Sequence, residues 1–132
     1  MINDFHIDCK EIRKLLIKSL HNAKSGHPGS SLSIIEILNY IYKFDNNFKL
    51  VLSKGHAVPA LYSVMNFYKI LDDDQLLSLR KVNSKTQGHP DRSKFDKIDC
   101  STGALGQGLS VAIGYAIASK LQNKNNNIYC IL

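Results

Sequence analysis

Three histidines in this chain of 132 residues share one local construction. Each follows a glycine, at Gly26-His27, Gly55-His56 and Gly88-His89, and a proline follows the first and the third. Glycine permits backbone angles that are closed to other residues, and a proline restricts the histidine before it to extended conformations. Each imidazole is therefore presented from a stiff loop, where it can donate hydrogen bonds or exchange protons near pH 7. Two other readings stay open: tight turns whose rings cap backbone groups, and a three-histidine zinc site.

A glycine-rich run, Gly103-Ala104-Leu105-Gly106-Gln107-Gly108, precedes a segment with helical character. It lacks the dinucleotide-binding pattern that follows a strand, and it lacks the lysine of a P-loop. Its glycines allow the backbone to approach a flat or phosphorylated ligand, and the N-terminus of the following helix favours an anion. Close packing of that helix explains the glycines equally well.

The histidine turns and the glycine run lie between segments with regular periodicity. Apolar spacing predicts helices at 8–24, with Asp8 as its cap, at 31–44, 59–71 and 109–121, and a short helix between Asp72 and Leu79. Apolar runs at 50–53 and 128–132 are typical of buried parallel strands. Residues 80–102 are polar and without periodicity, which predicts a long functional loop. We therefore expect an α/β fold.

Composition narrows the class of protein. With 44% hydrophobic and 21% charged residues, the chain has the make-up of one globular domain. It has neither a long apolar stretch nor a leader-like N-terminus, so we expect no membrane partner and a cytoplasmic location. The distant cysteines Cys9, Cys100 and Cys130 are expected to be reduced packing residues. The net charge of +6 is scattered along the chain, which argues against nucleic acid and favours small anionic ligands.

Four motifs together resemble the N-terminal part of transketolases, in order and in approximate spacing. They are Ser25–Ser33 (SGHPGSSLS), Leu52–Ala57 (LSKGHA), Gln87–Asp91 (QGHPD) and Ser101–Ser110 (STGALGQGLS). The resemblance runs from about Ile12 to Leu132, and it is greatest to the N-terminal subunit of a split, two-chain transketolase. It implies that residues 1–132 form part of a transketolase N-terminal diphosphate-binding domain, an incomplete three-layer α/β/α fold that binds thiamine diphosphate.

The resemblance also implies roles for individual residues. His27 matches a catalytic histidine that contacts the sugar substrate, and His89 matches one that hydrogen-bonds the hydroxyls of the two-carbon unit. His56 matches a histidine that touches the cofactor diphosphate. The segment Gly103, Ala104 and Leu105 matches the one that lies against the cofactor rings, although the family often has proline where Ala104 stands. Neutral imidazoles suit such roles, because they can donate to a developing alkoxide or accept a proton near pH 7.

The departures from the family concern the metal and the partner. In the family a Gly-Asp-Gly sequence follows the strand matched by residues 128–132, and its aspartate helps to hold Mg²⁺. Those metal ligands lie beyond this chain, so no residue here is assigned to the metal. We expect Leu132 to be a truncation point, because an apolar strand rarely forms a natural end. We also expect a C-terminal transketolase subunit or domain as partner, a dimeric complete enzyme, and little thiamine diphosphate binding by this chain alone.

The function that the resemblance implies is transfer of a two-carbon ketol unit between sugar phosphates, as in the pentose phosphate pathway. Two alternatives remain open. One is a related thiamine-diphosphate enzyme of sugar-precursor synthesis with chemistry like that of deoxyxylulose-phosphate synthase. The other is a truncated binding module without catalysis. All three readings need the imidazoles of His27, His56 and His89 and the backbone at 103–105 to converge on one cleft.

Overall fold

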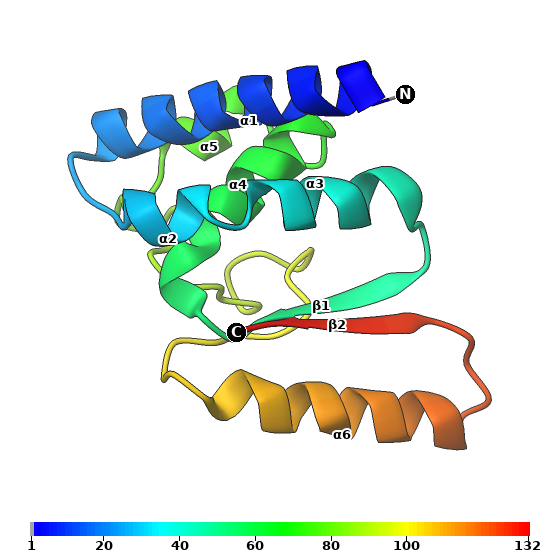
Figure 1. The fold of residues 1–132 in the computed structure, drawn as a ribbon. Coiled ribbons are helices and arrows are strands. Elements are labelled where there is room, and N and C mark those ends of the chain that lie inside the picture. Colours follow the sequence, from blue (N-terminus) through cyan, green and yellow to red (C-terminus); the bar gives the residue numbers. More distant parts are fainter. Residues whose placement is uncertain (1) are drawn as a thin grey trace.

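The computed structural model describes residues 2–132, and Met1 lies outside the described part. Seen along the chain, two short parallel strands are separated by a long helical and loop segment (Figure 1). The elements are, in order, α1 (Ile2–Ala23), α2 (Pro28–Leu32), α3 (Ile35–Phe44), β1 (Phe48–Leu52), the 3₁₀ turn η1 (Gly55–Ala57), α4 (Val58–Phe67), α5 (Asp73–Leu77), α6 (Gln107–Leu121) and β2 (Asn127–Ile131).

The strands and helices form three layers. β1 and β2 pair in parallel, in a register that runs from Phe48 opposite Asn127 to Leu52 opposite Ile131. Helix α6 lies on one side of this sheet, and α1 to α5 lie on the other (Figure 1). The parallel pairing of the two apolar runs and the α/β/α layering are thus confirmed. Both carboxyl ends of the strands point to the same edge, which in open α/β sheets is the edge where ligands bind.

The core lies between the sheet and the helices α1, α3 and α4. Every residue of α4 from Val58 to Asn66 is buried, which fits a helix that is covered by α1 and α3 and by the loop that follows. Helices α1 and α3 are amphipathic and turn their apolar faces towards it. The largest fully buried side chains are Tyr62, Ile12, Leu16, Ile35, Leu38, Leu52, Leu71, Leu76 and Leu79.

The structure corrects the expected start of the first helix. Helix α1 begins at Ile2, so Asp8 lies inside the helix and does not cap it. Its carboxylate instead forms an ion pair with Lys43 of α3 at 2.5 Å. The extra turns are stabilised by tertiary packing, because the ring of Phe5 stacks on that of Phe44 with 6.3 Å between centroids. Contacts of this kind override a capping pattern that is satisfactory by itself.

Other boundaries move by a few residues. The helix predicted at 31–44 is two helices, α2 and α3, separated at Ser33 and Ile34. Helix α4 ends at Phe67 because Lys69 adopts a left-handed backbone with φ 62°. The short helix after Asp72 is confirmed, and the Asp72 side chain caps it by accepting from the Gln75 amide in a complete capping box.

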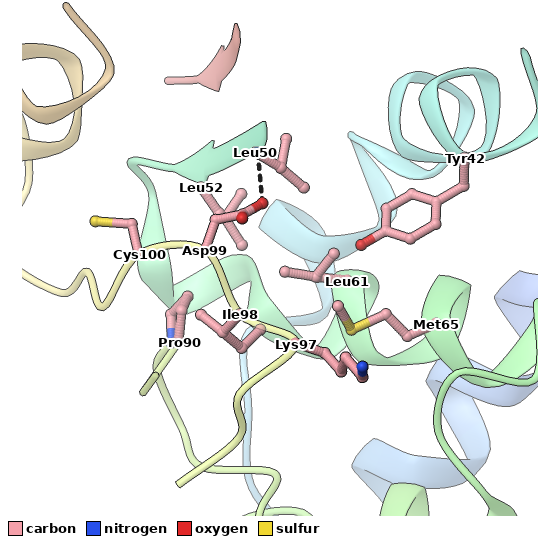
Figure 2. A pocket seen from close by; sticks show the side chains of 10 residues that line it. All are labelled: Tyr42, Leu50, Leu52, Leu61, Met65, Pro90, Lys97, Ile98, Asp99 and Cys100. Carbon is pink, nitrogen blue, oxygen red and sulfur yellow. Dashed lines mark hydrogen bonds between the residues drawn. The ribbon is translucent and has the colours of Figure 1, made fainter. Parts of the chain in front are cut away.

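The segment 80–102 has no helix or strand, as expected, but it is firmly packed on β1 (Figure 2). The carboxylate of Asp99 accepts hydrogen bonds from the Leu50 amide at 2.9 Å and from the Lys49 ammonium at 3.0 Å. Phe95 and Ile98 are buried in the core, and the hollow left beneath the segment measures only about 10 Å³. The loop thereby covers the edge of β1 that β2 does not pair.

Helix α6 begins at Gln107, two residues earlier than expected, and is apolar on its outer side as well as towards the sheet. Its buried residues are small, while larger apolar side chains face outward: Leu109, Val111, Ile113, Ile117 and Leu121. A helix that is apolar all round is typical of a protein interior. None of the helices within residues 2–132 combines the length and apolarity needed to cross a bilayer.

Candidate functional site

His27 and His56 lie side by side although they belong to different elements. His27 is the residue before α2, with φ −121° and ψ 79°, outside the α region that Pro28 disfavours, and its carbonyl accepts from the Ser31 amide at 3.1 Å. His56 lies in η1, immediately after β1. Their ring centroids are 5.3 Å apart at an interplanar angle of 67°. The carboxyl end of β1 and the start of α2 thus share a pair of imidazoles.

Polar groups lie on the segments that carry this pair. The Ser30 hydroxyl and the Nε2 atom of His56 share a hydrogen bond of 2.9 Å, which fixes the imidazole plane relative to α2. On the same connection the Lys54 ammonium reaches the Ser33 hydroxyl at 3.4 Å. Hydroxyl, imidazole and ammonium groups are donors that suit the oxygens of an anionic ligand.

His89 is brought to this edge of the sheet by the loop that covers β1. The Thr102 amide donates to the Pro90 carbonyl at 3.2 Å, and the Thr102 hydroxyl donates to the Leu52 carbonyl at 2.6 Å. Through Thr102, these two bonds link Pro90 to the last residue of β1. His89 and Gly103 consequently lie together: a Cβ atom at Gly103 would stand 3.7 Å from His89 Cδ2. An open hollow of about 420 Å³ is lined here by Gln87, Gly88, His89, Pro90, Asp91, Ser101 and Thr102.

Electrostatics link His89 to the other two histidines. Partial burial is the main cause that lowers the pKa of His89 below its ordinary value of 6.5, and the Arg80 guanidinium is the second cause. The imidazoles of His56 and His27 add smaller effects in the same direction. His89 is therefore close enough to the other two rings to feel their charge, and its surroundings favour the neutral form of its imidazole.

The glycine-rich run serves two purposes. Gly108 packs against Ser53, the residue after β1, because a Cβ atom at position 108 would come within 2.6 Å of Ser53 Cα, so the close-packing interpretation holds for this residue. Gly103 faces His89, as described above. Ala104 and Leu105 are exposed, with Leu105 exposed to 72%, and their contact with a cofactor stays a prediction.

Sequence reasoning did not assign roles to Ser30, Thr102 and Arg80. Ser30 and Thr102 stand inside the four motifs, and this membership was a signal that could have marked them. Arg80 stands outside every motif, and no pattern in the chain marks it. Within residues 2–132, no three His, Cys, Asp or Glu side chains gather closely enough to hold a metal ion.

The fold and site together define the class: a parallel α/β segment that presents three histidines and a glycine turn at the carboxyl end of its strands. The family model described as "Transketolase, thiamine diphosphate binding domain" matches residues 6–129. The chain belongs to this family.

Several curated relatives carry the transketolase name. A transketolase of Buchnera aphidicola from Schizaphis graminum is 36% identical over 121 residues, which cover 83% of this chain and 18% of that protein. The human transketolase is 38% identical over 128 residues, which cover 88% of this chain and 20% of that protein. The 6-deoxy-6-sulfo-D-fructose transketolase subunit SqwG of a Clostridium species is 35% identical, and the aligned region covers 98% of this chain and 51% of that subunit.

Solved structures agree with these relatives. The transketolase of Leishmania mexicana superposes with a TM-score of 0.80 at 28% identity, over 87% of this chain and 19% of that one. A transketolase variant of Pichia stipitis gives 0.79 at 31% identity, with the same coverage. The chain thus spans about a fifth of the length of most relatives that it matches, and about half of the SqwG subunit.

Proposed function

We propose that this chain supplies the diphosphate-binding side of a transketolase-type active site, as part of a larger or two-subunit enzyme. The reaction is transfer of a two-carbon ketol unit from a ketose phosphate to an aldose phosphate. The observation that carries the proposal is the convergence of His27, His56 and His89 with Gly103 at the carboxyl end of β1. Magnesium, the pentose phosphate pathway and a cytoplasmic setting belong to the same proposal.

The residues present fit thiamine diphosphate. Around the paired imidazoles, Ser30, Lys54 and His56 offer hydroxyl, ammonium and imidazole donors to a diphosphate. Gly103 adds no side chain of its own beside the His89 imidazole, so a flat ring could approach its backbone there. When bound, the cofactor supplies a stabilised carbanion equivalent at the transferred two-carbon unit.

The chain's own residues would then divide the work. His56 would bind the diphosphate, because Ser30 fixes the orientation of its ring. His27, whose ring is exposed and edge-on to His56, would donate to the substrate oxygen on which charge develops. His89 would hydrogen-bond the hydroxyls of the two-carbon unit, and its lowered pKa keeps it able to accept a proton as well as to donate one.

Two features support the larger assembly. Helix α6 exposes apolar side chains such as Ile113, Ile117 and Leu121 to 52%, 56% and 78%, an arrangement that needs cover from further protein. The relatives are longer than this chain, and one of them is named as a subunit. We propose that the missing cover, the Mg²⁺ ligands and the pyrimidine-binding partner come from that remaining protein.

A chimera tests the proposal. Residues 6–129 replace the matching segment in the Buchnera relative, and two-carbon transfer from a ketose phosphate to an aldose phosphate is measured with thiamine diphosphate and Mg²⁺. We expect activity, and we expect the H27A variant to lose it. His21 is exposed on α1, so H21A is the matched control that keeps activity.

Other outcomes would decide against the proposal. A folded chimera that binds the cofactor without transferring a two-carbon unit would favour the non-catalytic module. A chimera that condenses pyruvate with an aldose phosphate in preference to ketol transfer would favour chemistry like that of deoxyxylulose-phosphate synthase. Equal loss of activity in H21A and H27A would remove the special role of His27.

A further inference from the structure

Arg80 occupies an unusual place beside the site. It is a non-glycine residue in the left-handed region, with φ 63°, just after α5. This backbone is held in place, since the Arg80 amide donates to the Thr86 carbonyl at 2.9 Å. Thr86 is itself buried and bonded through its hydroxyl to Ser84 at 2.8 Å and to the Gln75 carbonyl at 2.8 Å. The backbone of Arg80 is thus fixed by its neighbours, which gives its side chain a defined starting point.

The guanidinium of Arg80 touches the residues that precede two of the histidine turns. One terminal nitrogen donates to the Ser25 hydroxyl at 2.7 Å, just before Gly26-His27. The group also lies against Gly88, just before His89: a Cβ atom at Gly88 would stand 3.0 Å from Arg80 Nε and 3.4 Å from its second terminal nitrogen. The planar guanidinium of Arg80 thus contacts two turns that are distant in the chain.

The charge of Arg80 also acts on His89. The charged and titratable groups that influence the His89 ring are Arg80, His56 and His27, and Asp91 follows two residues later in the same hollow. Arg80 is the strongest charge effect among those that lower the pKa of His89. Its Nε atom is buried without a hydrogen-bond partner, so the guanidinium is placed by the bond of one terminal nitrogen to Ser25 and by packing against Gly88.

We propose that Arg80 is a positioning residue that holds the two Gly-His-Pro turns together and thereby sets the positions of His27 and His89 relative to one another. The inference rests on the proposed function only where it concerns the roles of His27 and His89 toward a substrate. The contact of Arg80 with both turns, called the clamp below, is a property of this chain, and it can be measured without any transferase activity.

The first experiment is NMR on the chain itself, with backbone order parameters and histidine side-chain titrations. R80K keeps the positive charge but changes the length and geometry of the side chain. S25A removes only the hydroxyl that accepts the hydrogen bond from Arg80. Both should increase the mobility of residues 25–28 while the His89 pKa stays low. R80Q removes the charge, so it should also raise the His89 pKa towards 6.5. K81Q removes a neighbouring exposed charge and is the control that changes neither.

The outcomes separate clearly. Unchanged order parameters at residues 25–28 in both R80K and S25A would overturn the clamp, and so would an effect of K81Q equal to that of R80Q. Circular dichroism establishes that each variant is folded, and S25A carries the test if the arginine variants are not. In the chimera, R80K should lower kcat more than it raises the KM for cofactor. A chimera without activity would count against the proposed function and leave the NMR result standing.

Discussion

The imidazole rings of His27 and His56 meet edge to face, with 5.3 Å between their centroids. The two residues differ in how they are held. His56 shares a hydrogen bond with Ser30, whereas His27 is oriented through its backbone, by Pro28 and by the Ser31 amide. A ring with a fixed partner suits binding, and an exposed ring beside it suits contact with a reacting group. This difference gives the first prediction.

In the chimera, H27A should lower turnover by about 10²–10⁴-fold with cofactor affinity nearly unchanged, because a positioned acid–base group is lost. H56A should weaken cofactor affinity by about 10–100-fold, since a hydrogen bond to a charged group is lost. Steady-state kinetics and cofactor titration measure the two effects separately. The reverse pattern would mean that the two roles are exchanged.

The chain alone should bind thiamine diphosphate weakly, with a Kd of ~1 mM or weaker even with Mg²⁺ present. Residues 2–132 offer no cluster of ligands for the cation, which is the main partner for the charge of a diphosphate. Isothermal titration calorimetry measures this directly, with the chimera as positive control. A micromolar Kd for the chain would contradict the expectation and show that its own donors suffice.

His89 should titrate below its ordinary pKa of 6.5, because partial burial and then Arg80 disfavour its charged form. The unfolded chain then takes up this proton at higher pH than the folded chain. The contribution to stability is therefore fully present above about pH 6.5 and is lost as the pH falls through the lower, folded pKa. NMR titration and unfolding between pH 5 and 8, compared with H89Q, check both parts. A midpoint at or above 6.5 would contradict them.

Two glycines of α6 should respond in opposite ways to alanine. G108A should destabilise the chain by about 1–3 kcal/mol, because the new Cβ would meet Ser53 at 2.6 Å. G114A meets nothing within 4 Å and should stabilise the helix by about 0.5–1 kcal/mol. Chemical denaturation measures both in the same helix. Equal effects would mean that α6 does not pack on β1 through Gly108.

Much of the local structure followed from sequence patterns. The two apolar runs, the short helix after Asp72 and the loop 80–102 without helix or strand are each determined by neighbouring residues, and all three are confirmed. The three histidines were singled out by their glycine and proline neighbours. The capping box predicted at Asp8 was wrong, because the packing of Phe5 on Phe44 extends α1 beyond a local stop signal.

The sequence by itself determined which residues are candidates for chemistry and which family the chain belongs to, because motifs are made of residues close together in the chain. Only the tertiary structure decided how the motifs meet. It paired His27 with His56, closed the 90–102 loop through Thr102, and placed Arg80 between two turns. Such contacts join residues far apart in sequence, and they depend on how helices, loop and sheet pack together. No local pattern encodes that packing.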